Sequence, residues 1–231
     1  MRLISMLLGL LSIAAAQAQP QAGAVPVPAP WVAGTDYFTI DPPVRSGVDG
    51  KIEVTEVFSY GCPACNFAHP FIDKIRKSLP ANAVMTFVPA SFKPNEDWPM
   101  FQRAYLAAQA LGIADKSHNA MFDAVWKDKT LAIMNADGRT VKNPLPSIED
   151  AAQFYSKFGV KAEDFVATAN SFAISTKMKQ ADAFVRNSGT DSTPTIVVAG
   201  KYRLTFQSAG GDWNRMEQLI LYLVKKEADG K

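Results

Sequence analysis

The residues most able to do chemistry are the two cysteines of the chain, Cys62 and Cys65. Both lie in the stretch VFSYGCPACNFAHP, where Pro63 and Ala64 separate them. A C-x-x-C pair occurs in zinc sites, in haem attachment sequences, in short structural links and in redox centres. The spacing alone therefore leaves four kinds of site open.

The neighbouring residues favour the redox interpretation. A zinc site needs about four ligands, but only His69 and His118 are available besides the two cysteines, so we expect no metal. Covalent haem attachment requires a histidine directly after the second cysteine, and Asn66 stands there. A structural link across so short a loop would remove little chain entropy. It remains the alternative to a reactive pair.

The elements around the cysteines explain why the pair should be reactive. Residues 51–60 form an increasingly apolar strand, and apolar residues at three- and four-residue spacing predict a helix after the cysteines, kinked at Pro70. Cys62 then lies at a helix N-terminus, where unpaired N–H groups lower a thiol pKa, and Pro63 suits the first turn. Cys65, one turn further, is expected to be less exposed. We expect Cys62 to exchange with substrate and Cys65 to resolve the mixed disulfide.

The composition is that of a globular domain. The chain has 231 residues, of which 48% are hydrophobic and 20% are charged, with a net charge of +2. This length supports one sizeable domain that needs no cross-link for stability. The charge is too small to predict nucleic acid or an anionic membrane as a partner.

The N-terminus predicts export. Arg2 precedes an apolar run that ends in small residues around Ala18, the pattern of a signal peptide over residues 1–18 cleaved near Ala18. A retained membrane anchor is the alternative. Residues 19–36 are rich in Pro and Ala and are expected to form an extended leader with little to bury. Export to the periplasm would allow a disulfide to persist.

The mature chain combines strands with a block of helices. Its element order is β, β-α-β, helices from about residue 97 to 187, two strands and a last helix. Ser147 and Asp150 resemble a capping box, Asp212 is a candidate N-cap, and a tight turn is expected at Ala199 and Gly200. A helical module, residues 96–188, thus interrupts an α/β unit made of residues 37–95 and 189–231.

From about Tyr37 to Lys226 the sequence resembles DsbA-type thiol:disulfide oxidoreductases. The resemblance rests on EVFSYGCPAC, on the proline in the following helix, on the helical block and on STPTIVVAGKY. It implies an α/β thioredoxin fold with an inserted helical domain. It also implies a cis Thr193–Pro194 peptide bond beside the cysteines, at which substrate binds. From the residues alone, Pro194 can equally be an ordinary trans proline at a strand start.

Three positions near the cysteines bear on how strongly oxidising the disulfide is: Glu56, and two residues, Ala64 and Phe87, that differ from the family pattern. Taken alone, Glu56 can be a solvent-facing strand residue or an ion-pair partner. The resemblance implies a buried carboxylate near Cys65 that helps to move its proton, and burial would raise its pKa. Ala64 stands where the best-known relatives have histidine, and Phe87 where some have lysine. The oxidising strength therefore stays open.

These observations predict a dithiol oxidase that donates the Cys62–Cys65 disulfide to reduced, unfolded exported proteins. By resemblance, a DsbB-like membrane quinone reductase would reoxidise it. We expect no cofactor, no nucleic acid and a monomer. The alternatives are a disulfide isomerase or reductase of the same fold, and a non-enzymatic chaperone with an inert bridge. His69 is expected on the helix surface or in a substrate groove, and His118 is expected to face solvent.

Overall fold

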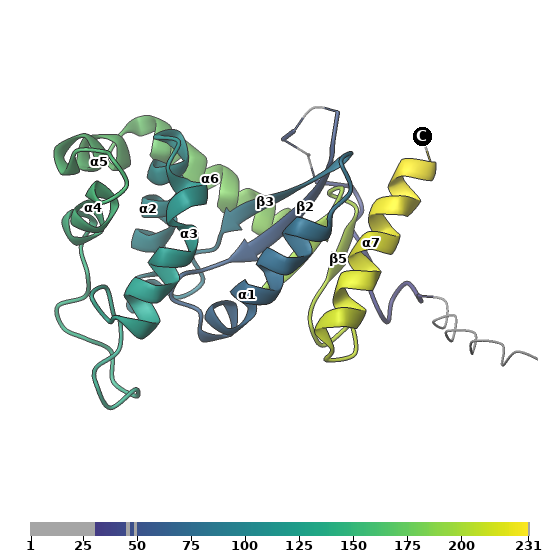
Figure 1. The fold of residues 1–231 in the computed structure, drawn as a ribbon, viewed down its shortest axis with the longest axis horizontal. Helices are drawn as coiled ribbons and strands as arrows, with labels where there is room; N and C mark the ends of the chain where they lie inside the picture. Colours follow the sequence, from purple (N-terminus) through teal and green to yellow (C-terminus); the bar gives the residue numbers. More distant parts are fainter. Residues whose placement is uncertain (1–30, 45–46, 49, 231) are drawn as a thin grey trace, which may run out of the picture. The chain divides into compact units, whose positions relative to one another are not determined.

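A computed structural model describes residues 31–44, 47–48 and 50–230. The predicted signal peptide and most of the predicted leader lie outside these residues. The described chain forms one five-stranded sheet, in the order β1-β5-β4-β2-β3 (Figure 1). β2 and β3 are parallel, and the other neighbouring pairs are antiparallel. The strands are β1 (Phe38–Thr39), β2 (Ile52–Phe58), β3 (Ala83–Pro89), β4 (Thr195–Val198) and β5 (Tyr202–Leu204).

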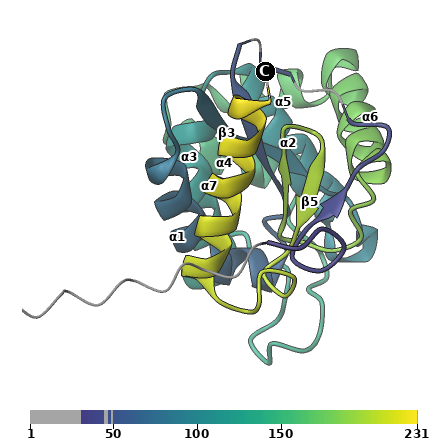
Figure 2. The same cartoon turned by 90° about the vertical axis from the view of Figure 1, so that its right-hand side faces the viewer.

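Helices cover both faces of the sheet. α1 (Pro63–Ser78) and α7 (Trp213–Asp229) lie side by side on one face, where Lys74 and Glu217 join them through an ion pair of 2.8 Å (Figure 2). α6 (Phe172–Asn187) covers part of the opposite face and contacts β3.

The remaining helices connect β3 to α6, so the helical block does interrupt the α/β unit. This arrangement confirms the predicted thioredoxin fold with an inserted helical domain. The elements of the block before α6 are η1 (Pro94–Glu96), α2 (Trp98–Ala110), α3 (Ala114–Phe122), the π-helical turn η2 (Asp123–Lys127), α4 (Ile148–Ser156) and α5 (Ala162–Ala169).

Local sequence signals account for several element ends. Ser147 and Asp150 form the predicted reciprocal capping box at the start of α4, and the Asp212 side chain caps α7 by accepting from the Arg215 N–H. At the turn between β4 and β5, Gly200 has a φ of 66°. A Cβ there would lie 2.1 Å from the Val44 carbonyl oxygen, so this turn requires glycine.

The core lies between the sheet and its helices. All seven residues of β2 are buried, as expected for a central strand with both faces covered. From α1, Cys65, Ala68, Ile72 and Ile75 are buried, so the residue that follows Cys62 by three positions belongs to the hydrophobic core. Pro70 lies within α1, and the helix continues beyond it to Ser78.

Residues 31–36, grouped with the leader from the sequence, pack against the folded domain. Trp31 contacts the core, and Asp36 is only 7% exposed. Asp36 accepts a hydrogen bond of 2.8 Å from the Val32 N–H and pairs with Arg215 of α7. The aromatic and acidic side chains at the end of this segment make it part of the domain, which its Pro- and Ala-rich composition did not indicate.

Candidate active site

The loop after β2 delivers Cys62 to the N-terminus of α1. Cys62 is the N-cap residue, with φ −88° and ψ 118°, and its Sγ accepts a hydrogen bond of 3.4 Å from the Cys65 N–H. Pro63 is the first residue of the helix, a position at which a missing N–H costs no helical hydrogen bond. Gly61 precedes Cys62 and packs closely on Trp98: a Cβ on Gly61 would lie 2.8 Å from the indole nitrogen.

Cys62 is held as a reactive thiol. Both cysteines are free, and Cys62 is 5% exposed. The pKa of Cys62 is lowered to about 6, chiefly by a hydrogen bond from the Cys65 side chain. Burial opposes this effect, while the Thr193 side chain and the N–H groups of Cys65 and Ala64 lower the pKa further. Cys62 is therefore mostly thiolate at neutral pH.

Cys65 has the opposite character. It is 0% exposed, and burial, followed by its contacts with Cys62, raises its pKa well above the ordinary value. A protonated thiol beneath a thiolate is the arrangement expected when the outer sulfur exchanges with substrate and the inner one is its disulfide partner. The geometry thus separates the two sulfurs as the sequence predicted.

Thr193 and Pro194 lie beside Cys62 although 131 residues separate Thr193 from it along the chain. The Thr193–Pro194 peptide bond is cis, as the family resemblance implies. In its thiol form, Cys62 Sγ donates to the Thr193 carbonyl oxygen at 3.4 Å. Pro194 directly precedes β4, so the central sheet fixes this segment opposite the start of α1.

Glu56 is a buried carboxyl group behind the two sulfurs. It is 2% exposed, and its Oε1 atom has no hydrogen-bond partner. Burial, then the charges of Cys62 and Asp73, raises the pKa of Glu56 to about 8. The solvent-facing alternative is therefore wrong. Phe87 is the register partner of Glu56 on β3, so no cation is supplied to Glu56 at that position.

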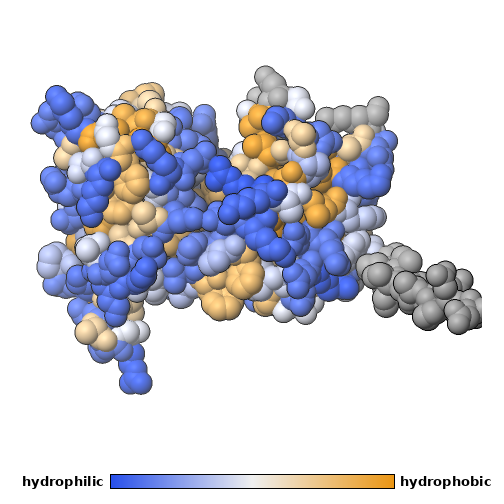
Figure 3. Space-filling view, viewed as in Figure 1, coloured by the Kyte–Doolittle hydropathy of each residue, from blue (hydrophilic) through white to orange (hydrophobic). Residues whose placement is uncertain are grey.

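A small apolar groove opens beside Cys62. Its volume is about 170 Å³, and Phe67, on α1, is 66% exposed. Trp213 forms a wall: its ring stacks on Phe71 at 4.6 Å and packs at a tilt against Phe206 at 4.4 Å between ring centres. Figure 3 shows apolar side chains gathered near the start of α1. The lining residues are Ala64, Phe67, Ser192, Thr193, Pro194, Phe206, Gln207 and Trp213.

Sequence reasoning missed most of this groove. Phe206, Gln207 and Trp213 come from the segment after β5, and their sequence carries no signal that they face Cys62. The sequence likewise carries no signal that Trp98 packs on Gly61, next to Cys62. The one signal that the sequence offers is an aromatic residue, Phe67, two positions after Cys65.

The two histidines have no direct place at the sulfurs. The expectation that His118 faces solvent is wrong: it is 5% exposed, and its Nδ1 lies 2.9 Å from the Tyr60 hydroxyl. Burial lowers the pKa of His118 to about 3, so this ring stays neutral within the core. His69 is half-buried and stacks on Phe122 at 5.0 Å.

Two further findings concern the described residues alone. No group of three or more His, Cys, Asp or Glu side chains in residues 31–44, 47–48 and 50–230 is placed to hold a metal ion. Within the same part of the chain, no helix is long and apolar enough to cross a membrane.

The fold and the site together define a class of protein. A C-x-x-C pair that caps the helix after a central strand, with a cis proline from a distant strand beside it, is the site of a thioredoxin-fold thiol:disulfide oxidoreductase. The protein is an enzyme of this class.

Comparison with known proteins places the chain more closely. No protein-family model matches the sequence. The thiol:disulfide interchange protein DsbA of Pseudomonas aeruginosa is 34% identical over 197 residues, which cover 85% of this chain and 86% of that protein. DsbA of Burkholderia cepacia is 31% identical over 231 residues, covering 100% of this chain and 99% of the relative.

Solved structures agree. The crystal structure of Pseudomonas aeruginosa DsbA has a TM-score of 0.73 and 34% identity, covering 87% of this chain and 96% of that one. The oxidoreductase DsbA from Xylella fastidiosa has a TM-score of 0.74 and 34% identity, covering 86% and 98%. The chain belongs to the DsbA family of thiol:disulfide interchange proteins. This membership favours a dithiol oxidase over the isomerase, reductase and inert-bridge alternatives.

Proposed function

We propose that, after export, the chain donates its Cys62–Cys65 disulfide to reduced, unfolded proteins. The observation that carries this proposal is that Cys62 Sγ caps the start of α1 above the fully buried Cys65. This position accompanies a pKa of Cys62 that is lowered to about 6. Relative to an ordinary thiol, this pKa stabilises the reduced form by about 1.4 kcal/mol at pH 7, equivalent to about 30 mV. A stabilised reduced form makes the disulfide a stronger oxidant.

The reaction is a two-step exchange. A substrate thiolate attacks Cys62 Sγ; a mixed disulfide forms, the Cys62–Cys65 bond breaks, and Cys65 leaves and takes up a proton. A second substrate thiolate then attacks the substrate sulfur of the mixed disulfide, and Cys62 leaves as a thiolate. Two electrons pass from the substrate dithiol to the enzyme, whose site holds one thiolate and one thiol.

Three neighbouring features serve these steps. Glu56 carries a proton at neutral pH because burial raises its pKa to about 8, so it can supply the proton that Cys65 takes up. The Thr193 carbonyl and the apolar groove beside Pro194 offer a hydrogen-bond acceptor and an apolar surface to an extended substrate chain. Pro63 and Ala64 complete the active-site motif between the sulfurs.

The cellular setting follows from the N-terminus and from family likeness. Export by a signal peptide over residues 1–18 would place the protein in the periplasm, where a disulfide persists. A DsbB-like membrane quinone reductase would reoxidise Cys62 and Cys65, with the two electrons passing to quinone. The protein would act as a monomer and would need no cofactor of its own.

Oxidation of a reduced test protein examines this function directly. Wild-type oxidised protein should form disulfides in the substrate with matching loss of its own, and Cys62→Ala should abolish the transfer. Cys65→Ala should also fail to oxidise the substrate, because it has no disulfide to donate. With a substrate that already carries a disulfide, it should instead accumulate a mixed disulfide through Cys62, because Cys65 is absent and cannot resolve it. Full oxidase activity in Cys62→Ala would contradict the mechanism.

The equilibrium potential against glutathione separates an oxidase from a reductase. A value near about −270 mV, that of thioredoxin, would favour a reductase. We expect a reduction potential above that of thioredoxin. Because Ala64 supplies no imidazolium beside Cys62, the N–H groups at the helix start and the Cys65 side chain should be the main groups that stabilise the Cys62 thiolate and so set this potential.

A further inference from the structure

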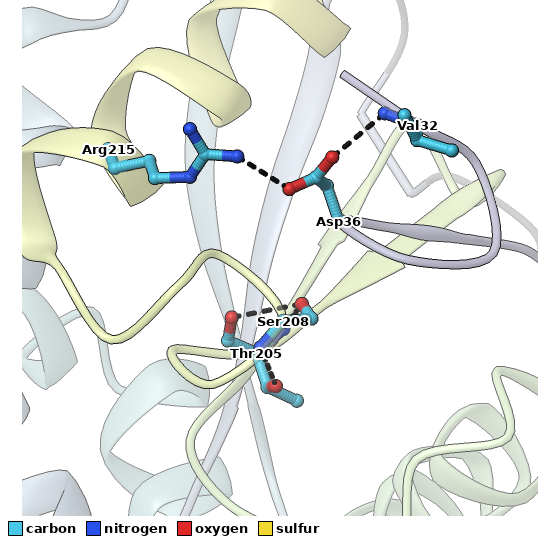
Figure 4. Close-up of polar contacts among 5 residues, drawn as sticks. All are labelled: Val32, Asp36, Thr205, Ser208 and Arg215. Atoms are coloured by element: carbon cyan, nitrogen blue, oxygen red, sulfur yellow. Dashed lines mark hydrogen bonds and ion pairs between the residues drawn. The ribbon is translucent and has the colours of Figure 1, made fainter. Parts of the chain in front are cut away.

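One wall of the groove beside Cys62 is formed by a loop against which the Arg215 side chain lies. Residues 205–212 connect β5 to α7, and they carry Phe206 and Gln207 into the groove. Gly210 and Gly211 have φ values of 84° and 72°, and glycines leave a backbone comparatively free. Within the loop, Thr205 and Ser208 exchange hydrogen bonds (Figure 4), and the N–H groups of Gly210 and Gly211 donate to the Gln207 and Phe206 carbonyls.

Arg215 joins the other end of this loop to the N-terminal segment. Its guanidinium lies 2.8 Å from Asp36 Oδ1 (Figure 4). The guanidinium carbon also lies 4.4 Å from the centre of the Trp31 ring. Its side chain also lies against the loop: a Cβ on Gly210 would be 3.2 Å from both Arg215 Cδ and Nε. Arg215 therefore contacts the N-terminal segment, the loop and its own helix at once.

The N-terminal segment is built to hold Asp36 in place. The Val32 N–H donates to Asp36 Oδ2 at 2.8 Å, and the Asp36 N–H donates to the Val32 carbonyl at 2.9 Å. The Gly34 N–H closes the same turn on Tyr37. The Asp36 side chain is 10% exposed and the Arg215 side chain is 38% exposed, so the pair is partly shielded from water and salt screens it less than a fully exposed pair.

The contacts lead from this segment to the groove. Trp213 lies two positions before Arg215, and its ring forms the groove wall through its contacts with Phe71 and Phe206. Without the Arg215 side chain, the Gly210 side of the loop would lose its contact with residues 31–36, and only the backbone hydrogen bonds of the loop and the Asp212 cap of α7 would hold this wall. Substrate would then have to order this wall on binding, which costs free energy.

We propose that residues 31–37 act through Arg215 as a positioning element for the substrate groove, so that Asp36, Trp31 and Arg215 determine affinity for apolar polypeptide segments. Asp36 and Trp31 do not line the groove, and the sulfur chemistry does not pass through them. This inference rests on the proposed function, because it assumes that substrate occupies the groove.

The test compares a groove-binding substrate with a small thiol. Oxidised full-length protein would react with a reduced two-cysteine peptide that has apolar residues beside its cysteines, and separately with reduced glutathione. Asp36→Asn should raise the half-saturating peptide concentration about tenfold, the effect of about 1.4 kcal/mol in binding. The limiting rate with peptide and the rate with glutathione should stay unchanged.

Two further variants sharpen the test. Arg215→Gln should match Asp36→Asn, and the double variant should be no weaker than either, because all three remove the same pair. Asp229→Asn, which removes the exposed 2.6 Å pair with Lys225 at the far end of α7, is the matched control and should behave as wild type. If Asp36→Asn does not fold, Trp31→Leu, which buries no unpaired charge, should show the same increase.

The outcomes separate this inference from the proposed function. Three results would overturn the positioning role alone. They are an unchanged half-saturating peptide concentration in Asp36→Asn, additive increases in the double variant, and an equal loss of rate with glutathione. Wild-type protein that oxidises the peptide no better than glutathione would show that the groove binds no substrate. That result would overturn both.

Discussion

Replacing Cys65 by alanine isolates the contribution that its side chain makes to the reactivity of Cys62. The Cys65 side chain is the largest cause of the lowered pKa of Cys62, which lies at about 6. A hydrogen bond to a charged group contributes about 1.5–3 kcal/mol, or about 1–2 pKa units. The pKa of Cys62 in Cys65→Ala should therefore rise to about 7–8. It should stay below about 8.5, the ordinary thiol value, because the N–H groups at the helix start remain.

The rate of iodoacetamide alkylation against pH measures this change, because only the thiolate reacts. The thiolate fraction of Cys62 at pH 7 should fall from about 90% to between about 10 and 50%. Cys65→Ser keeps a hydroxyl donor in place of the thiol and is the matched control, so its Cys62 pKa should stay near the wild-type value.

Two results would refute the reasoning. An unchanged pKa in Cys65→Ala would mean that the helix N-terminus alone stabilises the thiolate. A pKa of about 8.5 or above would mean that the backbone N–H groups contribute nothing at this N-cap.

Three further predictions concern stability. Burial raises the pKa of Glu56 from 4.5 to about 8, so this group makes the fold less stable as pH rises through that window. In urea unfolding of the reduced protein, the free energy of unfolding of Glu56→Gln relative to that of wild type should increase by about 3 kcal/mol from pH 5 to pH 7.5. A difference that does not change with pH would mean that Glu56 titrates normally. Asp212→Ala should cost about 1 kcal/mol by removing the N-cap of α7, and an unchanged urea midpoint would contradict the cap. Gly200→Ala should lower the thermal midpoint by several degrees, about 1 kcal/mol or more, since its Cβ would meet the Val44 carbonyl; a midpoint at or above the wild-type value would contradict this contact.

Much of the sulfur site follows from sequence neighbours alone. The apolar strand, Cys62, Pro63 and the helical periodicity after them place the first sulfur at a helix N-terminus and the second one turn inside. The capping box at Ser147 and the N-cap at Asp212 are predictable for the same reason. Each depends on residues within one or two turns of each other, and short-range backbone geometry settles them.

The environment of the sulfurs depends on residues far apart in the chain. Thr193 lies against Cys62 because β4 pairs with β2, and the burial of Glu56 and His118 depends on which helices cover the sheet. Spacing cannot show this, because a polar residue in a strand or helix pattern is compatible with either face.

The sequence by itself predicted Cys62 and Cys65 as the reactive pair, placed Cys65 one turn inside the helix that Cys62 begins, and indicated the interrupted α/β organisation. The tertiary structure alone decided that Phe67, Phe206 and Trp213 line one groove. It also decided that residues 31–36 pack against the domain and contact α7 through Asp36 and Arg215. The physical reason is that periodicity and capping act along the chain. Burial, pKa shifts and groove walls arise only when distant segments pack together.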